Sequence, residues 1–122
     1  MKEILQFIEY LKKEKEDCLK EAEALANDNR KDESNLVKIR SNMFEIVISI
    51  SKVAEQRFPQ NTISFIKEKI SKIATSWEES LAMAELHNDH MKIMYGRIKL
   101  DAMAQISETL EQIIGGVCDN ER

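Results

Sequence analysis

The sequence contains few of the residues that interrupt helices. Its 122 residues include only three glycines and one proline. These two residue types most disfavour a helix interior, so their scarcity predicts long helices. Hydrophobic residues make up 43% of the chain and charged residues 33%, which is too apolar for a disordered segment and typical of amphipathic helices. We therefore expect a single all-α domain.

Motifs for catalysis and nucleotide binding are also missing. The chain has no Gly-x-Ser-x-Gly elbow and no glycine-rich phosphate loop. Glu45 is the only carboxylate candidate for acid–base work, and its position between Phe44 and Ile46 directs it outward. Lysines and glutamates are interspersed, and the formal charge is −4, whereas a nucleic-acid groove needs clustered positive charge. We expect no enzyme activity, no cofactor and no nucleic-acid partner.

No hydrophobic run is long enough to cross a membrane. The most hydrophobic window, residues 44–50, still contains Glu45 and Ser49. The first residues form a mixed run rather than a signal peptide. The two cysteines, Cys18 and Cys118, lie 100 positions apart, a usage that suits reduced thiols better than a disulfide framework. The sequence thus predicts a soluble, cytoplasmic protein.

Apolar residues recur in alternating steps of three and four along most of the chain, which predicts amphipathic helices. We predict an antiparallel up-and-down bundle of four helical segments. Gly115-Gly116 is a typical helix stop, so residues 1–116 are expected to form one domain and residues 117–122 a flexible tail. The predicted helices cover 3–26, 35–57, 62–87 and 90–114. The apolar stripe expected on the second helix is Leu36, Ile39, Met43, Ile46, Val47, Ile50, Val53 and Ala54.

The connections between these helices are predicted from residues that cap or break helices. In the polar run before the second helix, Asp32 or Ser34 is expected to be the N-cap. Pro59 disfavours helical backbone at the residue before it, so the second helix should end near residue 57. Asn61 or Thr62 is expected to cap the third helix.

The third connection has two interpretations. His87-Asn88-Asp89-His90 has the composition of a turn, in which Asn88 adopts the left-handed conformation and Asp89 caps the next helix. However, the apolar stripe of the third segment continues in phase through the fourth. The alternative is therefore one continuous helix of about 75 Å, which would expose a long apolar seam and require a dimeric bundle.

The same stretch raises the possibility of a metal site. His87 and His90 are three residues apart, so on one helix both imidazoles could face one ion. Carboxylate partners are missing, because neither histidine is preceded by glutamate three positions earlier. We therefore predict no metal site, and a metal-binding bundle that uses His87 and His90 is the alternative function.

The remaining interpretation is a small interaction module, such as a regulator, adaptor or chaperone-like binder, that works through helix–helix contacts. The fourth segment has more apolar surface than one packing seam requires. We expect this surface to contact a second copy of the chain, giving a homo-oligomer such as a dimer, or a helix of a partner protein. The predicted contact residues are Met91, Met94, Tyr95, Gly96 and Ile98.

Overall fold

The computed structural model describes residues 2–119, which form four α-helices and contain no strand. The helices are α1 (Lys2–Asn27), α2 (Lys31–Arg57), α3 (Thr62–Leu86) and α4 (His90–Asp119). The predicted all-α bundle of four helices is confirmed. The predicted end of the last helix is wrong, because α4 continues through Gly115-Gly116. Residues 120–122 of the predicted tail lie outside the described residues.

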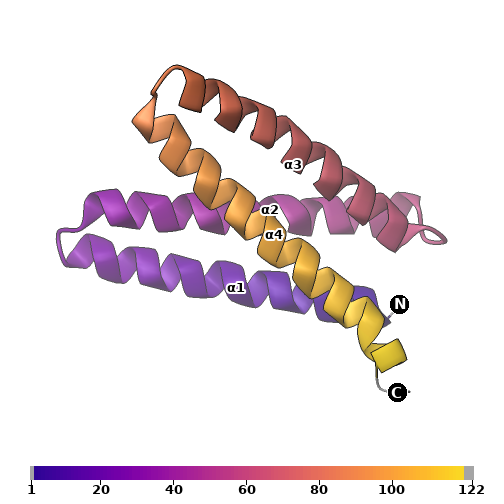
Figure 1. The fold of residues 1–122 in the computed structure, drawn as a ribbon. Helices are drawn as coiled ribbons and strands as arrows, with labels where there is room; N and C mark the ends of the chain where they lie inside the picture. Colours follow the sequence, from indigo (N-terminus) through magenta and orange to yellow (C-terminus); the bar gives the residue numbers. More distant parts are fainter. Residues whose placement is uncertain (1, 120–122) are drawn as a thin grey trace.

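The four helices form two hairpins that cross each other. Helices α1 and α2 lie side by side along their length, and α3 and α4 form the second hairpin (Figure 1). Helix α4 passes across the α1–α2 hairpin, while the turn between α3 and α4 lies away from it (Figure 1). Both α2 and α4 contact each of the other three helices, which explains why the apolar residues of the fourth segment cover so much of its circumference.

The core lies where the two hairpins cross. Phe7 and Leu11 of α1 meet Phe44 and Val47 of α2 in one cluster of side chains that are almost fully removed from water. Tyr10 is packed against this cluster, and its ring lies edge-on to Phe44 at a centroid distance of 6.3 Å. Helices α3 and α4 complete the cluster with residues from the ends that lie near the crossing: Ile66, Ile70, Met103, Ile106 and Leu110.

The buried face of α2 differs from the predicted stripe. Phe44 and Ile48 are buried, whereas Val53, which we assigned to the stripe, is exposed. The difference arises because α2 has three neighbours and buries a wider arc than one seam. Ser34 and Ser51 are also buried on this helix, with hydroxyl groups that donate to the carbonyls of Ala22 at 2.7 Å and Val47 at 2.8 Å.

The α1–α2 connection is shorter than predicted because an asparagine closes the helix. Asn29 has a φ of 61°, and the backbone N–H groups of Asn29 and Arg30 donate to the carbonyls of Ala26 and Leu25. This is a Schellman motif, with asparagine at the left-handed position. Arg30 occupies the N-cap position of α2 without a side-chain capping bond. The prediction that Asp32 or Ser34 caps this helix is therefore wrong.

The α2–α3 connection follows the prediction closely. Helix α2 ends at Arg57, and Phe58 before the proline has left the helical region with a φ of −132° and a ψ of 57°. Asn61 stands at the N-cap position of α3 without a side-chain capping bond. The Thr62 hydroxyl instead donates to the carbonyl of Phe58 at 2.9 Å, which ties the start of α3 to the end of α2.

The α3–α4 connection is a turn, so the alternative of one continuous helix is wrong. Asn88 has a φ of 54°, and the N–H groups of Asn88 and Asp89 donate to the carbonyls of Glu85 and Ala84. This is a second Schellman motif. The Asp89 carboxylate accepts the N–H of Lys92 at 3.2 Å and so caps α4, as predicted.

Candidate protein-interaction surface

The part of the α3–α4 hairpin beyond the crossing is built differently from the core. We call residues 77–99 the outer hairpin. Within it only Ala84 is buried, although Trp77, Leu81 and Tyr95 are partly covered. One ion pair links its two helices, between Arg97 Nη2 and Glu85 Oε2 at 3.6 Å. Both of these side chains are more than half exposed, so the pair contributes at most about 1 kcal/mol.

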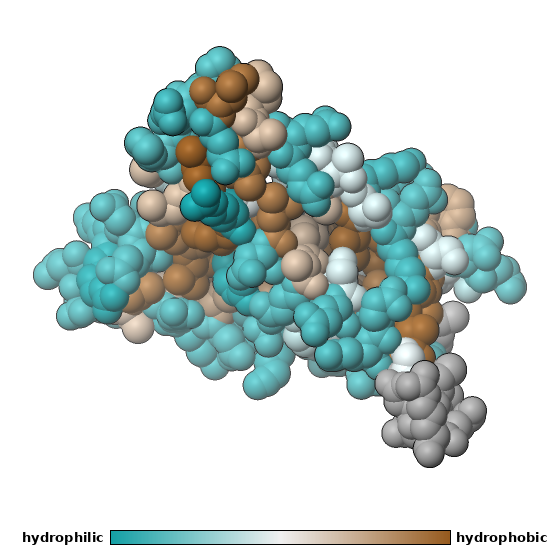
Figure 2. Space-filling model, viewed as in Figure 1, coloured by the Kyte–Doolittle hydropathy of each residue, from teal (hydrophilic) through white to brown (hydrophobic). Residues whose placement is uncertain are grey.

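Large exposed hydrophobic side chains concentrate on the outer hairpin. Of the eight in the described chain, four fall within residues 83–94, next to the turn. Their exposed fractions are 54% for Met83, 72% for Leu86, 55% for Met91 and 45% for Met94. Figure 2 shows hydrophobic residues at the surface of this end of the molecule. Exposed apolar residues gathered at one end of a molecule are typical of surfaces that contact another macromolecule. We call these four residues the tip patch.

Of the predicted contact residues, Met91, Met94, Tyr95 and Ile98 lie on one side of α4, within about 100° of arc, and Gly96 lies on the side that faces α3. Met91 and Met94 belong to the tip patch, and Tyr95 and Ile98 are half-buried. Met91, Met94 and Tyr95 also line a hollow of about 170 Å³ against the start of α2, with Leu36 on its other wall. Part of the predicted surface therefore already faces the chain's own second helix.

Gly96 has an intramolecular explanation. A Cβ atom at this position would lie 3.2 Å from Leu81 Cδ1 on α3. That separation is tighter than ordinary van der Waals contact, so the missing side chain lets α3 and α4 of the same chain approach closely. The helix that crosses at Gly96 is therefore α3.

Sequence reasoning did not assign Met83 and Leu86 to the contact surface. Leu86 lies five residues after Leu81, about 140° around the helix from the apolar stripe. The position of an apolar residue so far from the stripe is the sequence signal that could have assigned Leu86 to an exposed contact surface.

The two histidines are placed at the turn rather than on one helix. His87 is the C-cap residue of α3 and His90 is the first residue of α4, and both side chains are exposed. Cys18, whose thiol could in principle bind a metal, is buried in the core cluster. Across the described part of the chain, no three histidine, cysteine, aspartate or glutamate side chains are grouped so that they could hold a metal ion.

Glu45, the one candidate for acid–base chemistry, lies on the surface of α2. Its carboxylate pairs with the Lys15 ammonium, with Nζ and Oε2 2.6 Å apart, and both side chains are at least one-third exposed. The side chain points outward, as its position in the helix predicts. It links α1 to α2 across their outer face.

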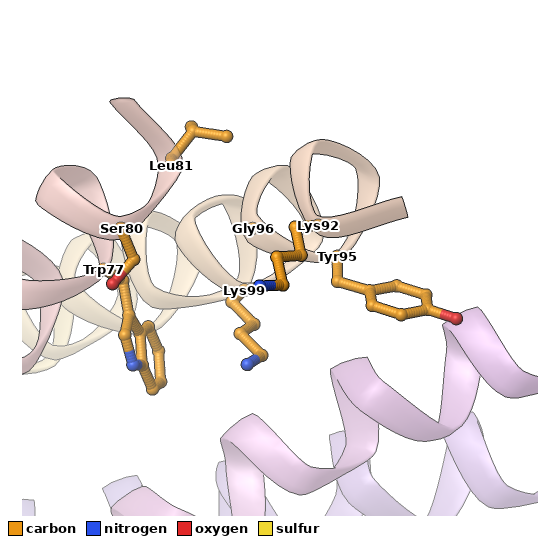
Figure 3. Close-up of a pocket in the computed structure, with 7 residues that line it drawn as sticks. All are labelled: Trp77, Ser80, Leu81, Lys92, Tyr95, Gly96 and Lys99. Carbon is orange, nitrogen blue, oxygen red and sulfur yellow. The ribbon is translucent and has the colours of Figure 1, made fainter. Parts of the chain in front are cut away.

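A groove lies between the two helices of the outer hairpin. Trp77, Ser80 and Leu81 of α3 and Lys92, Tyr95, Gly96 and Lys99 of α4 line a hollow of about 400 Å³ (Figure 3). The Lys99 ammonium lies 5.6 Å from the centroid of the Trp77 indole ring, within the range of a cation–π contact. This groove was not predicted, because it depends on how α3 and α4 pack against each other, which a local sequence pattern does not reveal.

Comparison with known proteins gives no match among family models, curated proteins or solved structures. As for membranes, no helix within residues 2–119 is both long and apolar enough to cross a bilayer.

Proposed function

We infer that this protein is a small, non-enzymatic interaction module of the cytoplasm that works through helix–helix contacts and associates with itself through the outer hairpin. The tip patch is the observation that carries this proposal. Four large apolar side chains lie next to one turn and are each about half exposed or more. Three of them are methionines, whose flexible side chains adapt to a partner's shape.

The size of the patch sets the expected strength of association. A fully exposed side chain of this size gains about 1.5–3 kcal/mol on complete burial, so four that are roughly half exposed offer about 3–6 kcal/mol per copy and about 6–12 kcal/mol in a dimer that buries both patches. Association costs at least about 4 kcal/mol in lost motional freedom, which leaves at most about 8 kcal/mol. The half-buried neighbours Tyr95 and Ile98 lie beside Met91 and Met94 on α4 and are expected to extend the contact. We expect a dimer with a dissociation constant no tighter than about micromolar.

Light scattering over a range of protein concentrations tests this proposal. The unaltered chain should approach twice its monomer mass as the concentration rises. Leu86→Glu and Met91→Glu place charges in the patch at exposed positions, so they should keep the helix content and leave a monomer. Ile98→Glu should also dissociate the dimer, but Ile98 is half-buried and its variant needs a check of folding by circular dichroism.

Leu5→Glu is the matched control for these variants. Leu5 is 60% exposed on α1, outside the outer hairpin, so the same change in charge and hydrophobicity should leave the dimer intact. A monomeric wild-type protein at every concentration would refute self-association. Equal dissociation by Leu5→Glu and Leu86→Glu would place the contact elsewhere.

A further inference from the structure

The groove of the outer hairpin is longer than its first hollow. A second hollow of about 410 Å³ is lined by Met83, Ala84, His87 and Asp89, and it shares Ser80 and Lys92 with the first. The two therefore form one continuous groove along α3, from Trp77 to His87. Ten residues of helix correspond to about 15 Å, or nearly three turns.

The α3 residues at the bottom of this groove lie on the same face of the helix as the α3 residues that are buried in the core. Ile66 and Ile70 are buried against the other helices, and Ile73 is packed at the edge of the same cluster. Trp77 and Ala84 follow on the same face of the helix, at steps of four and seven residues. Trp77 still packs against the core cluster, while the residues that line the two hollows come only from α3, α4 and their connection. The groove thus has the apolar character of a helix-packing surface.

The charged groups in the groove are mainly basic. Lys92 and Lys99 lie on the α4 wall, and Asp89 at one end is the only carboxylate residue among the lining residues. Lys92 Nζ is 3.9 Å from Asp89 Oδ2, which is a weak pair between exposed groups. Among the described residues, no carboxylate oxygen lies within 4 Å of Lys99 Nζ. The Lys99 ammonium instead makes the cation–π contact with the Trp77 indole. Figure 3 shows the Lys99 and Trp77 side chains projecting on the same side of the hairpin.

We propose that this groove binds an acidic, amphipathic α-helical segment of another protein. The apolar side of a segment of about three turns would pack on Trp77, Leu81 and Tyr95, as helices pack into apolar grooves. Its carboxylates would pair with Lys92 and Lys99, which makes the charge of the segment complementary to that of the groove. Tyr95 lines both the groove and the hollow that Met91 and Met94 line, and Met83 belongs to both the groove and the tip patch. The two surfaces therefore overlap, but the charge complementarity with Lys92 and Lys99 does not depend on self-association.

Two synthetic peptides test the proposal on the full chain. Each has roughly 14 residues, with leucine at helical spacing on one face. One carries glutamate and its twin carries lysine at the flanking positions. Trp77 is the only tryptophan of the chain, so its fluorescence reports occupancy of the groove directly. We expect the glutamate peptide to change the Trp77 emission saturably and the lysine peptide to bind at least about tenfold more weakly.

Paired variants identify the residues responsible. The double variant Lys92→Gln/Lys99→Gln should bind the glutamate peptide about five- to tenfold more weakly, as expected for the loss of two partly exposed ion pairs. Lys13→Gln/Lys20→Gln is the matched control, since it removes the same charge from exposed positions on α1. This control should bind as tightly as the unaltered protein.

Several results would overturn the proposal. One is equal binding of the two peptides, which indicates general apolar adhesion. Another is unchanged binding by the Lys92→Gln/Lys99→Gln protein. A third is a quench of Trp77 by a small anion such as citrate without any peptide binding. A fourth is a result in which the unaltered protein does not bind the peptide and the Lys92→Gln/Lys99→Gln protein has a lower mass in light scattering than the unaltered protein. The groove would then be occupied by a second copy of the chain. If the unaltered protein is a monomer at every concentration but still binds the glutamate peptide, only the proposed self-association is refuted.

Discussion

The two ends of the α3–α4 hairpin are made of similar amphipathic helices but have different surroundings. Near the crossing, Ile66, Ile70, Met103 and Ile106 are buried against α1 and α2. In the outer hairpin, only Ala84 is buried and the tip patch is exposed. An apolar stripe in the sequence therefore indicates that one face of a helix must be covered. Whether another helix of the same chain covers that face depends on how the two hairpins cross.

Local stability is therefore expected to be higher near the crossing of the hairpins than in the outer hairpin. Burial of apolar surface is the main favourable contribution to folding, and most of it comes from the residues at the crossing. The outer hairpin depends on helix propensity, the packing of Trp77 against the core cluster, the Asn88 turn and the close approach of Leu81 to Gly96. Regions with few buried apolar contacts open at a lower free energy than the core. The outer hairpin is therefore the part of the structure that a partner can stabilise most.

Alanine substitutions at the two ends should give the largest difference. Phe44 is completely buried in the core cluster, and Phe44→Ala should lower the free energy of unfolding by about 3–5 kcal/mol, because it leaves a large cavity. Met94 is half-exposed, so Met94→Ala should cost less than about 1 kcal/mol. Urea denaturation followed by circular dichroism measures both, at a concentration low enough to keep the chain monomeric. Comparable losses at the two positions would contradict the distinction between the two regions.

The periodicity of the sequence predicts where the helices lie but not all of the faces that they bury. Its boundaries agree closely for α1, α3 and the end of α2, because capping and proline signals are local. The face of α2 was partly wrong, since Phe44 and Ser34 are buried by neighbours that a local pattern does not reveal. The tip patch and the Trp77 groove depend on tertiary packing, so among their residues only Met91, Met94, Tyr95 and Gly96 were predicted as contact residues from the sequence.

The two asparagine turns allow a matched comparison of intermediate size. Asn29 and Asn88 both have positive φ values and both close a Schellman motif. A β-branched residue in this conformation costs about 1–2 kcal/mol. Asn29 lies in the turn between α1 and α2, which pack along their length. Asn29→Val should therefore lower the global free energy of unfolding by about 1–2 kcal/mol.

The Asn88→Val change should act mainly on the outer hairpin. We expect faster amide hydrogen exchange in residues 77–99 and a smaller loss of global stability than for Asn29→Val, because the outer hairpin contributes little to the core. If both variants reduce global stability equally while exchange in the outer hairpin is unchanged, the two regions unfold as one unit.

The smallest expected effect concerns the one titratable side chain in the core cluster. Burial raises the pKa of the Cys18 thiol above its ordinary value of 9.0, and Arg40 opposes that shift. Since the folded-state pKa is the higher one, the unfolded chain ionises first as the pH rises. The stability linked to this thiol is complete below the unfolded-state pKa and is lost as the pH rises through the folded-state value.

A comparison of two proteins isolates this contribution. Between about pH 8 and pH 10, the unaltered chain should lose more stability than Cys18→Ala, which has no thiol at this position. Urea denaturation at several pH values measures the difference, and the other titrating groups are common to both proteins. Parallel pH profiles would show that Cys18 is accessible to water in the folded chain.

Hydrogen–deuterium exchange as a function of protein concentration tests most directly whether a second copy covers the outer hairpin. Peptides from residues 77–99 should take up deuterium faster than those from the buried parts of α1 and α2 in dilute solution. As the concentration rises through the dissociation constant, uptake in residues 77–99 should slow while uptake in α1 and α2 stays constant. Uptake in residues 77–99 that is independent of concentration, or as slow as the core in dilute solution, would contradict the account.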